Sequence, residues 1–261
     1  MKDRLDKVLV FKKFVSTRSK AQELINSSLV KVNDKVINKC NYLVSDDDNI
    51  EIAANDILKY VSRAGLKLEK AIEEFKIDFK DKNIMDIGSS TGGFCDCAIK
   101  YGAKHVIGID VGTNLMHESL RNDKRISLYE QTNFKDLDHS FFENIDIITC
   151  DVSFISLTKV IEKVSGENIK VDMVCLIKPQ FECGKEIASK YKGIILDKSV
   201  HIDIINKIIS VMNNNGFYVL GIDSSPIRGG DGNIEYIAYI SNKVSKNIKI
   251  DVNNIVKKAF K

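Results

Sequence analysis

The sequence predicts an α/β protein in which a small N-terminal α+β domain precedes a larger Rossmann-like domain. Three observations support this prediction. Residues 1–45 carry ten Lys and Arg against four Asp and Glu, a local charge of +6, although the whole chain of 261 residues has a net charge of only +3. A glycine-rich turn joins an apolar strand to a helix in NIMDIGSSTGGF, residues 83–94. Beyond that turn, apolar strands alternate with amphipathic helices, which is typical of mostly parallel sheets.

Composition excludes several classes of protein. With 44% hydrophobic and 29% charged residues, the chain has enough apolar material for a core. It has no run of the roughly 18 to 20 apolar residues that a membrane helix requires, and the opening MKDRLDKVLVFKK is too charged for a signal peptide. We therefore expect a cytoplasmic protein without a membrane partner.

The six cysteines predict buried free thiols, because most of them lie in apolar patterns and disulfides are rare in a reducing compartment. Cys95 and Cys97 are spaced CxC without a second pair or a nearby histidine, so we expect no bound metal.

The first domain is expected over residues 1–57. RLDKVLVFKKFV and SKAQELI have the spacing of two amphipathic helices, and LVKVND and NIEI alternate as half-buried strands do. Arg4, Arg18 and Lys20 fall near the helix ends, where cations can bind phosphates. This pattern resembles the RNA-binding domain named after ribosomal protein S4, so these three residues are the predicted RNA-binding residues.

Residues 58–63 are expected to form an ordered linker to the second domain, residues 64–261. That domain opens with the helix AGLKLEKAIEEF, in which Lys67 lies at the edge of the apolar stripe. A lysine in this position usually lays its methylene groups on the core and extends its ammonium group into water.

The segment from Asn83 to Val111 is typical of a nucleotide-cofactor site. A buried strand leads into the turn from Gly88 to Gly93, a helix follows, and the next strand ends at Asp110, where an acid can bind ribose hydroxyls. The turn reads GSSTGG rather than GxGxxG, so it does not specify a pyrophosphate. Asp86, just before the turn, would repel a phosphate and suits the cationic amino-acid end of S-adenosylmethionine. The residues therefore favour S-adenosylmethionine over NAD.

Two later strands end on charged residues. IDIITCDVSF reaches Asp151 at its end, and VDMVCLIKPQF ends in Lys178. In parallel sheets, ligands bind at the carboxyl ends of the strands, where these two side chains and the glycine-rich turn are expected to meet. We further predict strands at FYVLGID and EYIAYIS, on either side of the loop SSPIRGGDGN.

Six motifs in order complete the pattern: YVSRAGLKL, DIGSSTGGF, IDVGTNLMHESLRNDKR, CDVSFISL, IKPQFE and GGDGNIE. Behind the RNA-binding pattern, they resemble the TlyA group of ribosomal RNA 2′-O-methyltransferases, long labelled haemolysins, whose catalytic domain is similar to the FtsJ (RrmJ) type. The resemblance implies a Rossmann-like methyltransferase fold with S-adenosylmethionine as cofactor. It implies methylation of a cytidine ribose in 16S and/or 23S rRNA within ribosomal subunits, with no need for an oligomer.

The resemblance also implies a catalytic tetrad of Lys67, Asp151, Lys178 and Glu235. Methyl transfer to a ribose hydroxyl requires the proton to leave as the new bond forms, and a partly desolvated lysine beside a second lysine suits that task. We expect Lys178 to be nearest the hydroxyl, with Lys67 as its partner and the two acids orienting both. The predicted cofactor contacts are Asp86, Gly88, Ser89, Ser90, Thr91, Gly92, Gly93, Phe94, Asp110, Val111, Asn133 and Asp151.

The sequence motifs expected of other functions match this chain less well. An amino-methyltransferase usually carries NPPY or DPPY where this chain has DVSF, and a carbon-five methyltransferase needs a reactive cysteine, whereas Cys150 lies in a buried strand. A membrane-active haemolysin and an RNA-binding protein without catalysis are the remaining alternatives. The haemolysin would need an amphipathic or spanning segment, for which the last eleven residues are the best match.

Overall fold

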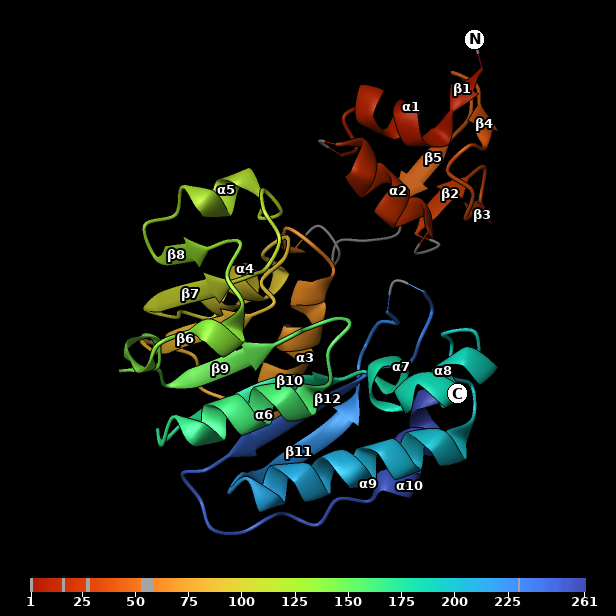
Figure 1. Ribbon diagram of the computed structural model, residues 1–261. Helices are drawn as coiled ribbons and strands as arrows, with labels where there is room; N and C mark the ends of the chain where they lie inside the picture. Colours follow the sequence, from red (N-terminus) through yellow and green to blue (C-terminus); the bar gives the residue numbers. More distant parts are fainter. Residues whose placement is uncertain (1, 16, 27–28, 53–58, 230) are drawn as a thin grey trace. The chain divides into compact units, whose positions relative to one another are not determined.

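The computed structural model describes residues 2–15, 17–26, 29–52, 59–229 and 231–261. The chain divides into two compact units, Met1–Lys59 and Tyr60–Lys261 (Figure 1). Residue 58 of the expected linker lies outside the described residues, and Tyr60 is buried in the core of the larger unit.

The small unit pairs two helices with short antiparallel strands. Its hydrophobic core comes from the apolar stripes of the helices and from the inward side chains of the strands. The strands β1 and β4 pair with each other, and β3, β2 and β5 form a three-stranded sheet in that order. The elements are α1 (Leu5–Phe11), α2 (Arg18–Asn26), β1 (Asp3–Arg4), β2 (Val30–Val32), β3 (Lys35–Ile37), β4 (Leu43–Val44) and β5 (Ile50–Ile52).

The larger unit is built on a seven-stranded sheet with the order β11-β12-β10-β9-β6-β7-β8. The strand β12 runs antiparallel to both of its neighbours, and the other paired strands are parallel. The mostly parallel α/β fold predicted from the sequence is therefore confirmed. The strands are β6 (Asn83–Ile87), β7 (His105–Ile109), β8 (Ile126–Tyr129), β9 (Ile147–Cys150), β10 (Asp172–Ile177), β11 (Tyr218–Ser224) and β12 (Tyr236–Ser241).

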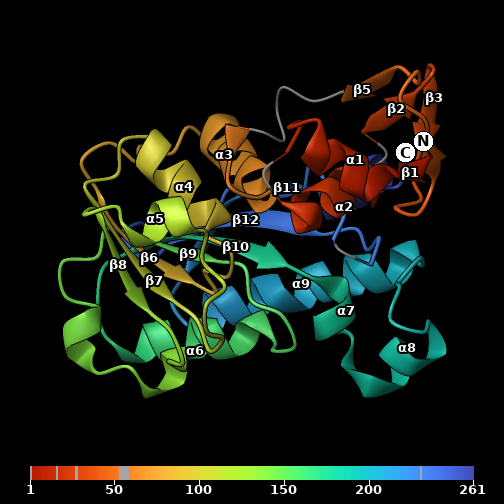
Figure 2. The ribbon, with the colours of Figure 1, turned by 90° about the horizontal axis from the view of Figure 1, so that it is seen from above.

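Helices cover both faces of this sheet, as right-handed crossovers between parallel strands require (Figure 2). Helices α3 and α4 pack on one face, and α6, α9 and α10 pack on the other. Short 3₁₀ helices at Phe134–Asp136 and His139–Phe141 follow β8. The α-helices are α3 (Ala64–Phe75), α4 (Gly93–Lys100), α5 (Glu118–Arg121), α6 (Leu157–Gly166), α7 (Pro179–Glu182), α8 (Gly184–Lys190), α9 (Lys198–Asn214) and α10 (Val252–Ala259).

The central strands are mostly apolar, because helices exclude water from both of their faces, and the buried polar side chains of Asp86 and Thr149 within them are hydrogen-bonded to each other. In β10, every residue from Met173 to Ile177 is buried. The other charged side chains of these strands therefore lie at or beyond the strand ends. This places the polar residues that follow β6, β7, β9 and β10 together at the carboxyl edge of the sheet.

Candidate active site

Four charged side chains from four different segments meet at this edge. Lys67 Nζ lies 2.7 Å from Glu235 Oε2 and 3.4 Å from Asp151 Oδ2, and Lys178 Nζ lies 2.6 Å from Asp151 Oδ1. Asp151 thus bridges the two ammonium groups, with one oxygen directed at each. The structure brings together all four residues that the TlyA resemblance selects.

These charges are held away from water. Lys67 and Lys178 are each 7% exposed, and Glu235 is 3% exposed. Buried charges are tolerated only where opposite charges and hydrogen bonds compensate for lost hydration, and the two lysines and two acids meet that condition. Burial alone would raise the pKa of Asp151, but the nearby ammonium groups of Lys67 and Lys178 outweigh burial and hold this pKa below its usual range.

The position of Lys178 follows from the residues around it. It comes directly after the buried strand β10, and Pro179 occupies the first position of α7, where the missing N–H is tolerated. The chain therefore leaves the sheet at Lys178 and turns into a helix. Its ammonium group also donates a hydrogen bond of 3.0 Å to Ser153 Oγ, on the loop after β9.

Lys67 projects inward from the first turn of α3 rather than extending to solvent. Its helix packs on the sheet through Leu68, Ala71 and Ile72, so the adjacent Lys67 reaches the carboxyl edge between Asp151 and Glu235. The usual surface role of a lysine at the edge of an apolar stripe is excluded here by its burial.

The glycine-rich turn lies against the tetrad. Gly88 has φ of +84°, and a Cβ atom at this position would lie 2.8 Å from the carbonyl oxygen of Asp151. The turn therefore needs glycine both for its left-handed backbone and for the close approach to Asp151. The N–H groups of Gly88 and Ser89 both bond to the carbonyl of Ile109, which ties the turn to the end of β7.

A cavity of about 470 Å³ opens beside this turn and is lined by six of the predicted cofactor residues, Gly88, Ser90, Asp110, Val111, Asn133 and Asp151. A second cavity of about 170 Å³ shares Gly88, Ser90, Asp151 and Ser153 with the first and is also lined by Ser89, Thr91, Gly93, Phe94 and Lys178. The shared residues join the cofactor region to the tetrad.

Asp110 is fixed by two backbone groups. Its Oδ2 accepts from the N–H of Ser90 at 2.8 Å, and its Oδ1 accepts from the N–H of Gly112 at 2.7 Å. Each carboxylate oxygen can accept a further hydrogen bond, so Asp110 is oriented to hold two ribose hydroxyls. Apolar side chains in the same cavity, among them Val111 and Phe134, can enclose an adenine ring. The residues present thus fit S-adenosylmethionine.

Two predicted cofactor residues lie below the turn instead. Asp86 is buried, and its two oxygens accept from Thr149 Oγ1 at 2.7 Å and from Cys95 Sγ at 3.1 Å. Burial raises the pKa of Asp86 to about 7, although both hydrogen bonds oppose that shift. Gly92 is a buried N-cap of α4 with φ of +90°. Both residues support the turn from within the core and line neither of these cavities.

Sequence reasoning missed an aromatic pair beside Lys178. Phe154 is 93% exposed with φ of +64°, which is unusual for a bulky residue, and its ring centre lies 5.2 Å from that of Phe181. Lys178 Nζ lies 5.8 Å from the centre of the Phe181 ring. Each phenylalanine follows the charged residue at the end of a strand by three positions, in DVSF and KPQF. This shared spacing is the sequence feature that could have predicted the pair.

Glu182 was also missed, and it joins the two loops that carry these groups. Its Oε2 accepts from Ser156 Oγ at 2.6 Å, and its Oε1 accepts from the N–H of Leu157 at 2.7 Å. Glu182 therefore binds α7 to the start of α6 and holds the loop with Ser153 and Phe154 next to Lys178.

In the small unit, Arg4 and Arg18 converge on the buried carboxylate of Asp6. Arg4 donates to it through Nε and Nη2 at 3.0 Å each, and Arg18 donates through Nε at 2.9 Å. The side-chain amide of Gln22 is a fourth donor group, from a third residue. Burial would raise the pKa of Asp6, but these donors outweigh burial and hold it well below its usual range. Lys20 lies on α2 and stays partly exposed without joining this cluster.

The carbon-five methyltransferase alternative finds no support among the described residues. Cys150 is buried in β9, and burial raises the pKa of its thiol, which is the opposite of what a nucleophile needs. The part of the chain that the structure describes also contains no group of three or more His, Cys, Asp or Glu residues that could hold a metal ion.

The sheet order, the turn after β6 and the acid after β7 define a Rossmann-like methyltransferase that uses S-adenosylmethionine. The chain belongs to the FtsJ-like methyltransferase family, which it matches over residues 60–241, and it matches the S4 domain over residues 3–50. Both parts of the sequence-based resemblance are thereby confirmed.

Individual relatives cover nearly the whole chain. Hemolysin A of Brachyspira hyodysenteriae is 44% identical over 239 residues, which cover 90% of this chain and 98% of that protein. The 23S rRNA (cytidine-2′-O)-methyltransferase TlyA of Campylobacter jejuni is 35% identical over 246 residues, covering 88% of this chain and 96% of the relative. A solved structure of a presumed hemolysin from Streptococcus thermophilus is 34% identical, with a TM-score of 0.77 and coverage of 99% and 95%.

The name hemolysin prompts the question of membrane insertion. Within the residues that the structure describes, no helix combines the length and the apolar character needed to cross a membrane.

Proposed function

We propose that this protein transfers a methyl group from S-adenosylmethionine to the 2′-hydroxyl of a cytidine ribose in 16S and/or 23S rRNA. The observation that carries the proposal is the paired tetrad of Lys67, Asp151, Lys178 and Glu235, which adjoins the cofactor cavity through Gly88 and Asp151. The cytidine-2′-O specificity in the name of the Campylobacter relative supports the choice of nucleotide and of atom.

The cofactor supplies an electrophilic methyl carbon on a positively charged sulfur. The hydroxyl oxygen forms a bond to that carbon, the carbon–sulfur bond breaks with its electron pair going to sulfur, and the hydroxyl proton passes to a base. The protein contributes by aligning the oxygen and by accepting the proton as the bond forms.

Lys178 is the proposed group nearest the reacting hydroxyl, because it lines the small cavity together with the glycine-rich turn. In this proposal, the ammonium group first releases one proton to solvent, and the neutral amine then accepts the hydroxyl proton. Lys67 is the partner cation, and it is anchored by Glu235 at 2.7 Å. Asp151 bridges the two nitrogens, which limits their repulsion and fixes their direction.

The proposed cofactor contacts are the predicted cofactor residues that line the two cavities, and the carboxylate of Asp110 is proposed to accept hydrogen bonds from the ribose hydroxyls. The proposed RNA-binding domain is residues 1–57 and the proposed catalytic domain is residues 64–261. The proposed linker, residues 58–63, is ordered at its end, where Tyr60 packs into the core of the larger unit. Arg4, Arg18 and Lys20 are proposed to contact rRNA phosphates, since both arginines stay partly exposed while Asp6 fixes their direction. Such an enzyme would act on ribosomal subunits in the cytoplasm and would not need an oligomer.

The test is methyl transfer with isolated ribosomal subunits. Purified protein is incubated with methyl-labelled S-adenosylmethionine and with 30S or 50S subunits, and ribose methylation is then mapped on each rRNA. Lys178→Ala should lower the single-turnover rate at least about 100-fold while the Kd for the cofactor stays within about twofold, because general base catalysis contributes 10²–10⁴-fold.

Lys104→Ala is the matched control, because this exposed lysine lies just before β7 at the opposite edge of the sheet. It should methylate at the wild-type rate. Absence of label with wild-type protein on both subunits would reject the proposed activity. Full activity of Lys178→Ala would retain the activity and reject the role of Lys178.

A further inference from the structure

Helix α8 presents its cations on the side of the catalytic unit where the tetrad lies. Lys185 and Lys190 are exposed on α8, and Lys192 is exposed just beyond it. None of the residues of α8 is buried, whereas a surface helix normally buries an apolar stripe. The helix follows directly after α7, which begins at Pro179, next to Lys178.

A buried amide joins this region to the loop that carries Glu235. Asn233 is buried, its Nδ2 donates to the carbonyl of Gly193 at 2.8 Å, and its Oδ1 accepts from the N–H of Ile195 at 3.0 Å. Because Asn233 precedes Glu235 by two residues, the chain after α8 has a fixed position relative to the tetrad.

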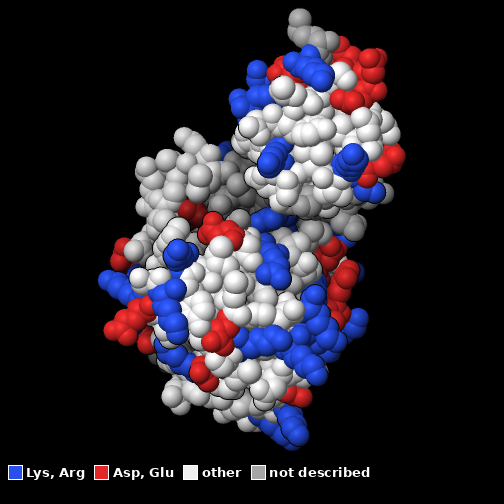
Figure 3. All heavy atoms as spheres, turned by 90° about the vertical axis from the view of Figure 1, so that its right-hand side faces the viewer, with Lys and Arg blue, Asp and Glu red and all other residues white. Residues whose placement is uncertain are grey.

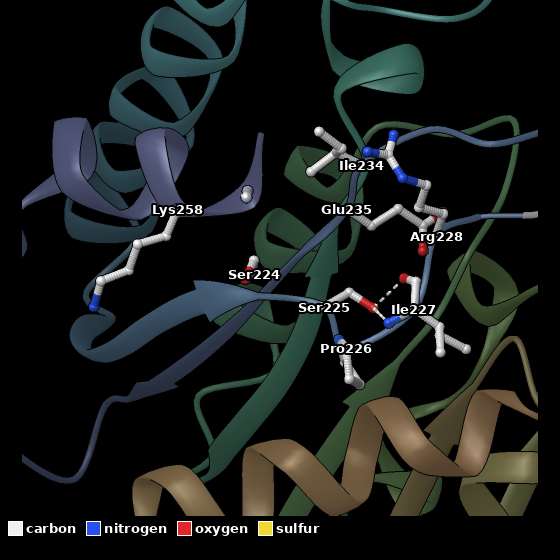
Figure 4. Close-up of a pocket in the computed structure, with 9 residues that line it drawn as sticks. Ser224, Ser225, Pro226, Ile227, Arg228, Ile234, Glu235 and Lys258 are labelled. Atoms are coloured by element: carbon white, nitrogen blue, oxygen red, sulfur yellow. Dashed lines mark hydrogen bonds between the residues drawn. The ribbon is translucent and has the colours of Figure 1, made fainter. Parts of the chain in front are cut away.

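Arg228 extends the same surface from the other side of that loop. A cavity of about 250 Å³ lies there, and its lining includes Arg228, Glu235 and Lys258 (Figure 4). Ser225 closes the turn before Arg228 by donating to the carbonyl of Ile227 at 2.6 Å and accepting from its N–H at 3.3 Å. Arg228 Nη1 donates to the carbonyl of Gly232 at 3.1 Å, which directs this exposed guanidinium group along the rim.

Few acidic side chains lie near these cations, and several of them are buried or already accept hydrogen bonds from other residues. Glu182 and Glu235 are buried, and Asp197 accepts from Tyr191 and from the N–H of Ser199. Glu186 and Asp231 are the exposed acids in the same segments. Figure 3 shows many Lys and Arg side chains on this face of the catalytic unit, with Asp and Glu side chains both among them and along its edges.

We propose that Lys185, Lys190, Lys192 and Arg228 form a binding surface for the RNA backbone beside the target ribose. This inference rests on the proposed function. The cations are spread over a helix, a turn and a loop instead of converging on one point, and this spacing suits successive phosphates better than a single small anion. Long, exposed lysines bind phosphates as point charges, and Arg228 adds a planar donor next to the tetrad.

The test measures the salt dependence of RNA binding. The triple variant Lys190→Ala/Lys192→Ala/Arg228→Ala is compared with wild-type protein for binding to isolated 30S and 50S subunits, each measured between 50 and 200 mM salt. Each lost phosphate contact lowers the slope of log affinity against log salt by about 0.7 to 0.9, so the slope should fall by about 2. Affinity should fall about tenfold, with an unchanged Kd for S-adenosylmethionine.

The matched control is Lys80→Ala/Lys104→Ala/Lys124→Ala, which removes three exposed cations from the opposite, amino edge of the sheet. It should bind with the wild-type slope. The proposed surface is rejected if the slope is unchanged in the first variant or falls equally in both variants. It is also rejected if the slope falls for binding to heparin but not for binding to ribosomal subunits. Because binding is measured without methyl transfer, a wild-type protein that binds but does not methylate rejects only the proposed function.

Discussion

At the scale of single residues, the site depends on polar groups that are buried with defined partners. Asp151 faces two ammonium groups, Glu235 faces one, and Asp110 accepts from two backbone N–H groups. Asp86 differs from them, because it is buried and its two donors are the Thr149 hydroxyl and the Cys95 thiol instead of cations. Its ionisation should therefore be visible in the stability of the protein.

Asp86→Asn should flatten the pH dependence of stability. The pKa of Asp86 is raised to about 7 in the folded protein, from about 3.9 in an unfolded chain. The folded state therefore holds an extra proton between these values, and the free energy of unfolding falls as pH rises through that window. Thermal unfolding between pH 4 and 8 should show this fall in wild-type protein and a smaller one in the variant.

Asp136→Asn serves as the control, since Asp136 is exposed and should leave the profile unchanged. If Asp86→Asn keeps the full wild-type decline, the titrating group lies elsewhere.

At the scale of elements, the catalytic geometry depends on how two loops are joined. The loop after β9 carries Asp151, Ser153 and Phe154, and the segment after β10 carries Lys178 and Phe181. Glu182 holds them together by capping the start of α6. The two strands place the loops next to each other, and this carboxylate then fixes their relative position.

Glu182→Ala should reduce both stability and the rate of methyl transfer. Losing the bonds to Ser156 and to the Leu157 N–H should lower the free energy of unfolding by about 1–2 kcal/mol, as loss of a helix cap does. The released loop should also lower the single-turnover rate, because Ser153 no longer holds Lys178. Urea unfolding and single-turnover assays measure the two effects separately.

Glu182→Gln keeps the shape and an acceptor for the Leu157 N–H, so it should recover much of the lost rate. A destabilised alanine variant that retains the wild-type single-turnover rate would limit Glu182 to a structural role.

At the scale of the whole molecule, the two units have separate hydrophobic cores. Tyr60 and the other residues at the start of the larger unit pack against α3 and α4, so the catalytic unit should fold from about residue 59 onward. Both units should then contribute to the binding of a large RNA, whereas the cofactor should bind to the larger unit alone.

A chain that begins at Lys59 should bind S-adenosylmethionine with a Kd within about twofold of the full protein. Its KM for ribosomal subunits should rise at least about tenfold, because the phosphate contacts proposed for Arg4, Arg18 and Lys20 are removed. Calorimetry and subunit titration measure these constants. Loss of cofactor binding in a folded truncated chain would show that the units depend on each other.

The local sequence was sufficient to predict most of the fold. Apolar strands, amphipathic helices and the GSSTGG turn carry their signals within a few residues, because backbone periodicity and glycine conformations are local properties. The strands β1, β3 and β4 were not predicted. The strands β1 and β4 have only two residues each, and β3 exposes both Lys35 and Val36, so it lacks the alternation of a half-buried strand.

The sequence by itself determined the fold class, the cofactor turn and the charges that end the strands. Only the tertiary structure decided that Asp151 bridges Lys67 and Lys178, that Asp86 lies under the turn, and that Glu182 joins two loops. These relations link residues between 9 and 84 positions apart. They depend on strand order and helix packing, which bring distant side chains within hydrogen-bonding distance and which no local pattern encodes.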